Sequence, residues 1–287
     1  MVTAAASAFV PVILNDVRIE YRAVQRNLEG ATATGVLWQA APGRFLLEAP
    51  GVARFLVTGG IEIAIDAERE APSVRVAGFL RMAPLAALLY QRGILACHAA
   101  AVSAPGGAVL IAGVSAAGKS SVAASLVDRG CDFLADDLVG IDLDAEGRPV
   151  AHATEREIAL WPDAVAQLFP AKRPEWASPL DPSESGLQHF AVAGRSSAVP
   201  VPLRAVYYLA SQESSVMRRQ DSGSVSRFEL VTRMCFNSRV ADTLLDHTLF
   251  LRLAGAITCQ VAVKHIVRSR VPWQAGSIAD RILEDRS

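Results

Sequence analysis

The sequence predicts an α/β protein with a small β-rich N-terminal domain, and three observations lead to this prediction. The chain has 287 residues, of which 51% are hydrophobic and 20% charged, so it can bury one large core or two modest ones. Residues 17–66 form short, β-leaning runs separated by glycines. From residue 94 onward the pattern becomes strand, glycine loop, helix and strand, the order typical of α/β domains. We therefore predict a β-rich accessory module over residues 1–90 and an α/β domain over residues 91–287.

The N-terminal module is predicted from apolar runs that glycines interrupt. The clearest of these runs are residues 44–48, 53–57 and 61–65. A helix is expected next, over residues 82–92, because Pro84 suits a first helical turn and Gly93 follows the apolar stripe. This helix would join the module to the second domain.

The second domain is predicted to begin with two buried strands, residues 94–102 and 108–112, joined by a tight turn. Apolar residues at helical spacing follow as far as Gly130, which suits a helix C-terminus. Residues 131–134 then have the pattern of a short strand. Further along, residues 171–200 are expected to form a long surface connection. The last elements expected are a strand over residues 205–209 and helices over residues 240–255 and 278–284.

Charge and cysteine content exclude several classes of protein. Lys plus Arg (28) nearly balances Asp plus Glu (29), so no strong overall field would draw the chain to nucleic acid or an anionic membrane. The four cysteines are far apart and form no C-x-x-C pair, which favours a reducing compartment, with the cytoplasm as the default. Residues 1–14 are apolar without a basic residue before them and are shorter than the roughly 20 residues of a membrane span. We therefore expect neither a nucleic-acid partner nor membrane attachment.

Residues 113–120 satisfy G-x-x-x-x-G-K-[ST], the phosphate-binding loop, and lie between a β-like run and a helix. Chance would produce this pattern on the order of 0.002 times in a chain of this composition. Backbone N–H groups from about Ser115 to Ser120 and the positive end of the helix would surround a triphosphate. Lys119 would contact the β and γ phosphates, and the Ser120 hydroxyl would bind Mg²⁺. The residues assigned to this nucleotide site are Gly113, Ser115, Ala116, Ala117, Gly118, Lys119, Ser120 and Ser121.

Asp136 and Asp137 follow Ser120 by one helix and one strand, so a βαβ unit would bring them to the sheet edge where the phosphates lie. Two adjacent carboxylates there can divide the work, one holding Mg²⁺ and the other taking the proton from an attacking hydroxyl. The alternative is an ordinary Asp-Asp turn. His98, one strand before the loop, could bind phosphate or relay a proton, although a lone histidine is more often a satisfied core residue.

Three segments together resemble a known family. Residues 98–102, 113–121 and 134–139, in this order and at these separations, resemble the catalytic domain of HPr kinase/phosphorylase and its HPr-kinase-like bacterial relatives. The resemblance is specific over about residues 91–143, and residues 50–57 are similar to the N-terminal part of the relatives rather than of true HPr kinase. It implies a P-loop kinase core on a phosphoenolpyruvate-carboxykinase-type sheet, and phosphoryl transfer from ATP to a serine hydroxyl.

The resemblance also implies roles for single residues. By it, Asp137 is the base, Asp136 a metal-side carboxylate and His98 an active-site residue. Glu157 matches, across a gap, a later acidic residue of the family, so the implied metal ligands are Ser120, Asp136 and Glu157.

Two departures from the family pattern stand out. Ala116 occupies a position where the family usually has Gly, and if that position needs a positive φ the alanine costs about 1 kcal/mol. The late Arg-rich segment that contacts phosphate in the family has no counterpart here, which weighs against the reverse, phosphorolytic reaction. Arg233 and Arg239 are candidates to supply the missing charge.

The sequence therefore predicts an ATP- and Mg²⁺-dependent serine kinase whose acceptor is a protein or peptide. The catalytic residues of this prediction are Asp137, Asp136, His98 and Lys119. Two alternatives stay open: a small-molecule kinase of the same fold, and a regulator that binds ATP as a switch and transfers nothing. A homo-oligomer is compatible with the sequence, which names neither the acceptor nor the preferred phosphoryl donor.

Overall fold

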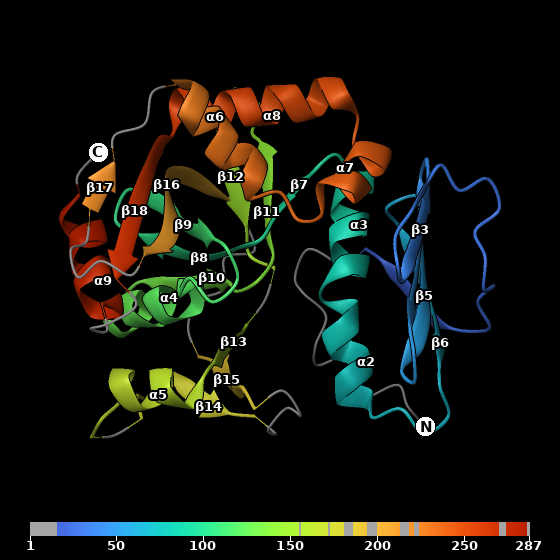
Figure 1. Cartoon of the computed structure of the whole chain (residues 1–287), viewed down its shortest axis with the longest axis horizontal. Helices are drawn as coiled ribbons and strands as arrows, with labels where there is room; N and C mark the ends of the chain where they lie inside the picture. Colours follow the sequence, from blue (N-terminus) through green and yellow to red (C-terminus); the bar gives the residue numbers. More distant parts are fainter. Residues whose placement is uncertain are drawn as a thin grey trace. The chain divides into compact units, whose positions relative to one another are not determined.

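The chain divides into two compact units in the computed structural model (Figure 1). The first unit contains Met1–Ala96 and Cys235–Arg252, and the second contains Cys97–Met234 and Leu253–Ser287. The first unit therefore includes a late segment that was expected, from the sequence, in the α/β domain. The residues that the structure describes are 16–154, 156–171, 173–180, 186–193, 200–212, 218–220, 224–269 and 274–285.

A six-stranded sheet forms the centre of the first unit, in the order β1-β6-β5-β4-β3-β2. Strands β2 to β6 pair antiparallel with their sequence neighbours, whereas β1 pairs parallel with β6. The apolar runs predicted over residues 44–48, 53–57 and 61–65 coincide with three of these strands. The six strands are β1 (Arg18–Tyr21), β2 (Ala33–Thr34), β3 (Trp38–Ala41), β4 (Arg44–Ala49), β5 (Ala53–Thr58) and β6 (Glu62–Ala67).

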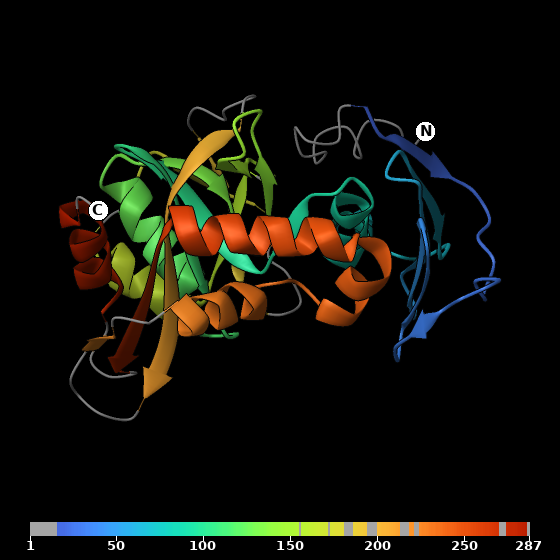
Figure 2. The ribbon, with the colours of Figure 1, turned by 90° about the horizontal axis from the view of Figure 1, so that it is seen from above.

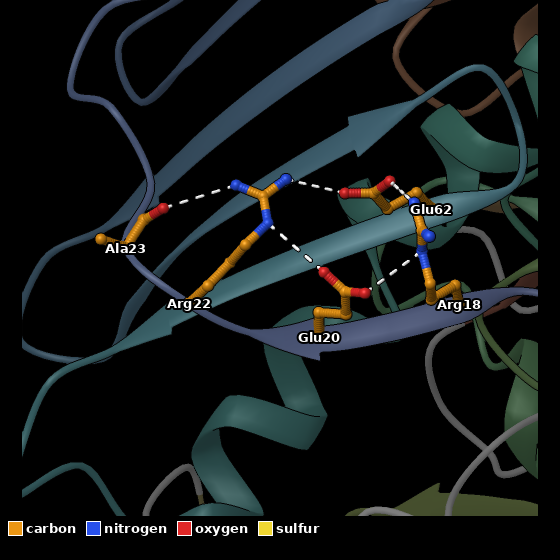
Figure 3. A network of polar contacts seen from close by, with 5 residues as sticks. All are labelled: Arg18, Glu20, Arg22, Ala23 and Glu62. Atoms are coloured by element: carbon orange, nitrogen blue, oxygen red, sulfur yellow. Dashed lines mark hydrogen bonds and ion pairs between the residues drawn. The ribbon is translucent and has the colours of Figure 1, made fainter.

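Charged side chains cover the β1 edge of this sheet (Figure 3). Glu62 accepts from Arg22 Nη2 at 2.7 Å and also from Arg18, while Glu20 lies 3.3 Å from Arg18 Nε and 3.6 Å from Arg22 Nε. The hydrogen bonds from Arg22 and Arg18 hold the pKa of Glu62 below its usual range. Exposed ion pairs contribute little stability, so the main consequence is a charged edge strand that resists pairing with another chain.

Helix α3 (Ala83–Gln91) matches the helix predicted over residues 82–92, with Pro84 in its first turn. It follows α2 (Ser73–Leu80), which was not predicted from the sequence. Within the described residues, the stretch Ser73–Gln91 is long and apolar enough to cross a membrane by length and composition alone. The structure breaks this stretch into two helices and buries residues 84–90 against β4 and β5, as in the core helix of a globular unit.

The late segment belongs to the first unit because specific side chains hold it there. The Tyr90 hydroxyl lies 2.5 Å from the Phe236 carbonyl oxygen, and the Phe236 amide donates to the Ala96 carbonyl at 2.9 Å. Arg239, on helix α7 (Ser238–Leu244), donates to the Thr34 carbonyl at 2.9 Å and lies 5.6 Å from the Trp38 ring centroid. These contacts join residues far apart in sequence, and no local pattern predicts them.

The main sheet of the second unit contains the order β10-β8-β9-β16-β12-β11, and β18 also pairs with β16. The long strands β16 and β18 run side by side in the same direction (Figure 2). The single strand predicted over residues 94–102 is instead β7 (Leu95–Cys97), at the boundary of the units, and β8. The other strands are β8 (Ala99–Ala104), β9 (Gly107–Gly113), β10 (Asp132–Ala135), β11 (Val139–Leu143), β12 (Pro149–His152), β16 (Val201–Gln212), β17 (Arg218–Gln220) and β18 (Ala262–Ser269).

A three-stranded sheet, in the order β13-β15-β14, lies within the segment between β12 and β16. The long connection predicted over residues 171–200 therefore contains two strands, and residues 172, 181–185 and 194–199 of it lie outside the described part. The helix predicted over residues 240–255 is divided between α7 and α8. The remaining elements are β13 (Glu157–Leu160), β14 (Ala177–Pro179), β15 (Gln188–Val192), α4 (Lys119–Asp128), α5 (Pro162–Leu168), α6 (Ser224–Arg233), α8 (His247–Gln260) and α9 (Ala275–Glu284).

The directions of three strands decide what lies at one edge of the main sheet. Strand β8 is antiparallel to both of its neighbours, β9 and β10, so β9 and β10 run in the same direction with β8 between them. The predicted βαβ crossover is therefore present in outline, but its two strands are not adjacent. The carboxyl ends of β9 and β10 meet at the same sheet edge, where the glycine loop and the Asp136-Asp137 pair follow them.

Helix α4 begins directly after the loop and packs against β8, β9 and α9. Its residues Val122, Ala123 and Leu126 are buried, as their spacing predicts. Gly118 precedes the helix in the left-handed region at φ 94°, and no side chain caps the first turn. The N-terminal amides of α4 are therefore left without a side-chain acceptor at the end that faces the loop.

Gly113, at the end of β9, has no room for a side chain. Its φ is 144°, and a Cβ there would lie 2.4 Å from the Leu209 carbonyl oxygen on β16. Gly130, after α4, has a φ of 91° but open space around it.

We expect Gly113→Ala to lower the free energy of unfolding by about 3 kcal/mol or more, because the backbone must shift. Gly130→Ala should cost only about 1 kcal/mol, and equal losses in urea unfolding of both variants would contradict this account.

Candidate nucleotide-binding site

The loop after β9 contains a turn that uses one of its own amides. The Ala117 amide donates to the Val114 carbonyl at 3.1 Å, and Ala116 has a φ of 60°, as at the third position of a type II turn. The expected set of consecutive amides from Ser115 to Ser120 is therefore interrupted at Ala117. The positive φ anticipated for position 116 is present, and it is carried by an alanine where glycine is preferred.

Lys119 lies in the interior of the loop and is 6% exposed. Its ammonium group donates to His98 Nε2 at 3.0 Å and to the carbonyls of Gly113 and Val114 at 3.3 and 3.4 Å. Burial lowers the pKa of Lys119, while the charges of Asp137 and Asp136 oppose that shift. The ammonium is thus satisfied by groups that a polyphosphate could replace.

His98 links Lys119 to the acidic turn. Its Nδ1 lies 3.0 Å from the Asp137 carbonyl oxygen, and its backbone amide donates to Met234 at 2.7 Å. Since Nε2 accepts from Lys119, the ring hydrogen is on Nδ1 and the imidazole is neutral. Burial and then the Lys119 charge lower the pKa of His98, which agrees with this neutral form. The structure therefore places His98, a predicted active-site residue, beside the loop lysine and the acidic turn.

Asp136 is 2% exposed and is held from two sides. The Ser120 hydroxyl donates to Oδ1 at 2.9 Å, and the Ala159 amide on β13 donates to Oδ2 at 3.3 Å. Burial raises the pKa of Asp136 to about 7, the Asp137 charge adds to the shift, and the Ser120 hydrogen bond opposes it. Ser120 and Asp136, both predicted metal ligands, are therefore in direct contact.

Asp137 is the central residue of a γ-turn. The Leu138 amide donates to the Asp136 carbonyl at 2.8 Å, and Asp137 has a φ of 63°. This class of turn is rare and strained, so neighbouring groups must hold it. The Asp137 carbonyl accepts from His98, and the Leu138 carbonyl accepts from the buried hydroxyl of Thr154. The residue predicted as the base therefore occupies a backbone conformation that the fold maintains at a cost.

The remaining predicted site residues are Glu157, Ser115 and Ser121. Glu157 is on β13 two residues before Ala159, so the two share one face of that strand. No group of three or more His, Cys, Asp or Glu side chains suited to a metal occurs in the described part of the chain. Ser115 is exposed at the loop tip and Ser121 is buried on α4.

The arginines suggested as sources of phosphate charge have other partners. Arg233 pairs with Glu229 at 2.6 Å, and Arg239 contacts Thr34 and Trp38 within the first unit. Another arginine, Arg268 on β18, reaches the loop: its Nε donates to the Ala117 carbonyl at 2.7 Å. Arg268 was not predicted because it belongs to no motif, and only its place at the end of an apolar β-like run could have suggested it.

The residues of the site can bind ions of both signs. The uncapped N-terminus of α4 and the Lys119 ammonium favour a bound anion. The Ser120 hydroxyl and the Asp136 carboxylate supply hard oxygen donors at the same end of the helix. The site therefore suits a polyphosphate anion together with a small divalent cation.

The protonation of Asp136 gives the stability of the protein a specific pH dependence. Its pKa is about 7 in the folded chain, against an unfolded value near 4, so the folded state binds more protons between these pH values. We expect the free energy of unfolding to fall by a few kcal/mol as pH rises from about 4 to about 7. Asp136→Asn should remove this fall, because asparagine does not titrate.

Urea unfolding of both proteins across this pH range, in buffer with a chelator, measures the effect. Parallel pH profiles for the wild type and Asp136→Asn would contradict it.

The strain at Ala116 predicts an unusual response to glycine. Ala116→Gly should raise the free energy of unfolding by about 0.5 kcal/mol, because relief of the positive φ outweighs the added flexibility of the unfolded chain. Ala145→Gly, at an exposed turn residue that does not have a positive φ, should lower it by about 0.5–1 kcal/mol. Thermal unfolding of both variants tests the difference, and a loss of stability at both positions would argue against strain at Ala116.

Comparisons with known proteins give a distant likeness in structure alone. No family model and no curated protein matches this sequence. Among solved structures, the chain is similar to the HPr(Ser) kinase/phosphatase from Coxiella burnetii, at 13% identity and a TM-score of 0.31, over 66% of this chain and 93% of that one. This is a distant structural relationship that carries no argument about function. Function must therefore be inferred from the geometry of the site.

Proposed function

We propose that this protein is an ATP- and Mg²⁺-dependent kinase that transfers the γ-phosphate to a serine hydroxyl of a protein or peptide. The observation that supports this most is the contact between Ser120 and Asp136, 2.9 Å long, at the first turn of α4. It joins a hydroxyl in a phosphate-binding-loop motif to a buried carboxylate at the end of a neighbouring strand. Such a pair is needed where a metal must be held beside a polyphosphate.

The nucleotide's phosphates would lie against the loop and the N-terminus of α4. The amides of Gly118, Lys119 and Ser120 belong to the uncapped first turn, and they would donate to phosphate oxygens. Lys119 would exchange the carbonyls of Gly113 and Val114 for phosphate, while His98 Nε2 continues to accept from its ammonium. The neutral imidazole thereby keeps the lysine charge at the reacting phosphate.

The donor set fits Mg²⁺. Ser120 and Asp136 offer oxygen ligands, and Mg²⁺ binds through few protein groups because it keeps several waters. A cation would also stabilise the ionised form of Asp136, whose pKa burial has raised to about 7. When bound, Mg²⁺ neutralises charge on the phosphates; Glu157 is a further candidate ligand on the strand that carries Ala159.

Asp137 is assigned the role of base. Its carboxylate accepts the proton of the acceptor hydroxyl while the new O–P bond forms and the bond to the β–γ bridging oxygen breaks. The charge of Asp137 already acts on Lys119, His98 and Asp136, so it lies within the same electrostatic cluster. The strained γ-turn fixes its backbone, which reduces the motion lost on reaching the reactive geometry.

Two alternatives differ in the step after nucleotide binding. A small-molecule kinase would use the same residues with another acceptor. A nucleotide-dependent switch would bind ATP without transfer, and it is favoured by the loop's internal bonds, since Ala117 and Lys119 are both satisfied by the protein itself.

The four free cysteines fit a reducing compartment, and we place the protein in the cytoplasm on that ground.

Substitution at Asp137 separates these functions. If Asp137 is the base, Asp137→Asn should retain ATP affinity within about twofold and lose transfer by 100-fold or more, since general-base catalysis contributes about that much. Lys119→Ala should weaken both binding and transfer. Asp132→Asn, at the exposed far end of β10, is the matched control and should change neither.

Transfer of labelled phosphate from ATP to serine peptides, proteins and small alcohols measures the reaction, and calorimetry measures binding. Normal ATP binding by the wild type without transfer to any acceptor would favour the switch. Full transfer by Asp137→Asn would overturn the role of that residue.

A further inference from the structure

We propose that Arg268 is a positioning residue that orients the Gly118 amide, and fixes the turn before it, by holding the carbonyls of Ala117 and Ala116 on the side opposite to the proposed phosphate site. The inference rests on the proposed function and adds to it a residue outside the loop motif, the acidic pair and the histidine. It follows from two hydrogen bonds, the register of the central strands and the space around Gly118.

The register of three parallel strands brings Arg268 to the loop. Gly113 on β9 pairs with Leu209 on β16, and Arg268 on β18 pairs with residue 211 of β16. Arg268 is therefore two residues beyond the level at which β9 ends. From that position Nε donates to the Ala117 carbonyl at 2.7 Å, and Nη2 lies 3.4 Å from the Ala116 carbonyl.

These bonds fix the direction of the loop's peptide units. In a trans peptide the C=O and the following N–H point in opposite directions. When Arg268 holds the Ala117 carbonyl, the Gly118 amide must therefore point away from the guanidinium. The Ala116 carbonyl is held in the same way, and the amide of that peptide unit, on Ala117, is bonded to Val114. Because the donor is charged, these bonds are stronger than neutral ones. They also polarise the peptide units, which makes the amide hydrogens better donors to a bound phosphate.

Gly118 has a second reason to be glycine. A Cβ at this position would lie 3.2 Å from Arg268 Nη2 and 3.5 Å from Cζ and Nε, and the φ of 94° already disfavours any side chain. The glycine thus lets the guanidinium lie close over the loop backbone. The motif usually has glycine at this position because the phosphate comes close to the backbone. In this structure Arg268 also fills the space that a Cβ would need.

The assignment differs from direct contact between arginine and the terminal phosphate. Nε and Nη2 are directed to carbonyls, on the side of the peptide units opposite to the amide that would bind phosphate. Arg268 should therefore affect every nucleotide whose phosphates use the loop amides, and it should affect ADP and ATP alike. Substitution of Arg268 should leave the affinity for adenosine, which has no phosphate, unchanged.

Calorimetric titrations of the full chain with Mg²⁺-ADP, Mg²⁺-ATP and adenosine provide the test. We expect Arg268→Gln to weaken ADP and ATP binding by the same factor, about 10-fold or more, and Arg268→Lys to lie between the wild type and Gln. Any affinity for adenosine should stay within about twofold.

Arg129→Gln is the matched control for a merely structural effect. Arg129 ties the other end of α4 to α9, through Asp280 at 2.6 Å and the Gly276 carbonyl at 3.3 Å. This variant should lower thermal stability without changing the ratio of ADP affinity to adenosine affinity. Should Arg268→Gln fail to fold, Arg268→Lys carries the test, since it keeps the charge but loses the planar fork of donors.

Three results would overturn the inference. Unchanged ADP and ATP affinities in the Arg268 variants, beside normal binding by the wild type, would remove the positioning role and leave the proposed function intact. A loss confined to ATP would assign Arg268 to the terminal phosphate instead. Absence of nucleotide binding by the wild type would overturn both the proposed function and this inference.

Discussion

The hydrogen bond from Ser120 to Asp136 joins the two halves of the candidate site, and the other contacts there are arranged around it. It connects the first turn of α4, which follows β9, to the residue that follows β10. The two strands reach the same sheet edge only because β8 lies between them and is antiparallel to both. The γ-turn at Asp137 and the bond between His98 and Lys119 then follow from where the two strand ends meet.

The site combines backbone strain with nearly complete satisfaction of its polar groups. Ala116 and Asp137 both hold a positive φ, one in the loop and one in the acidic turn, and positive φ is unfavourable for residues with a Cβ. The lysine, histidine and buried aspartate each have hydrogen-bond partners within the protein. A site of this kind is organised before a ligand binds. Binding therefore loses little conformational entropy, but the ligand must replace hydrogen bonds that the protein already makes.

Local sequence predicted the parts of this site that depend on local pattern. The loop motif, the helix that follows and the strand before Asp136 all have short-range signals, and the structure places His98, Lys119, Ser120 and Asp136 together. Arg268 and Ala159 could not be predicted, because contacts between elements far apart in sequence bring them to the site. Arg268 depends on strand register across the main sheet, and Ala159 lies on β13 of the three-stranded sheet. The return of residues 235–252 to the first unit was missed for the same reason, since it depends on Tyr90, Phe236 and Arg239 meeting partners far away in sequence.

The central claim is that main-chain amides at the start of α4 bind a polyphosphate. The most direct measurement is the amide NMR spectrum of protein labelled with ¹⁵N-glycine, recorded with and without Mg²⁺-ATP. The account predicts that the Gly118 resonance moves on saturation while the resonance of Gly130, at the opposite end of the helix, stays in place. A Gly118 resonance unaffected by saturating nucleotide would contradict it.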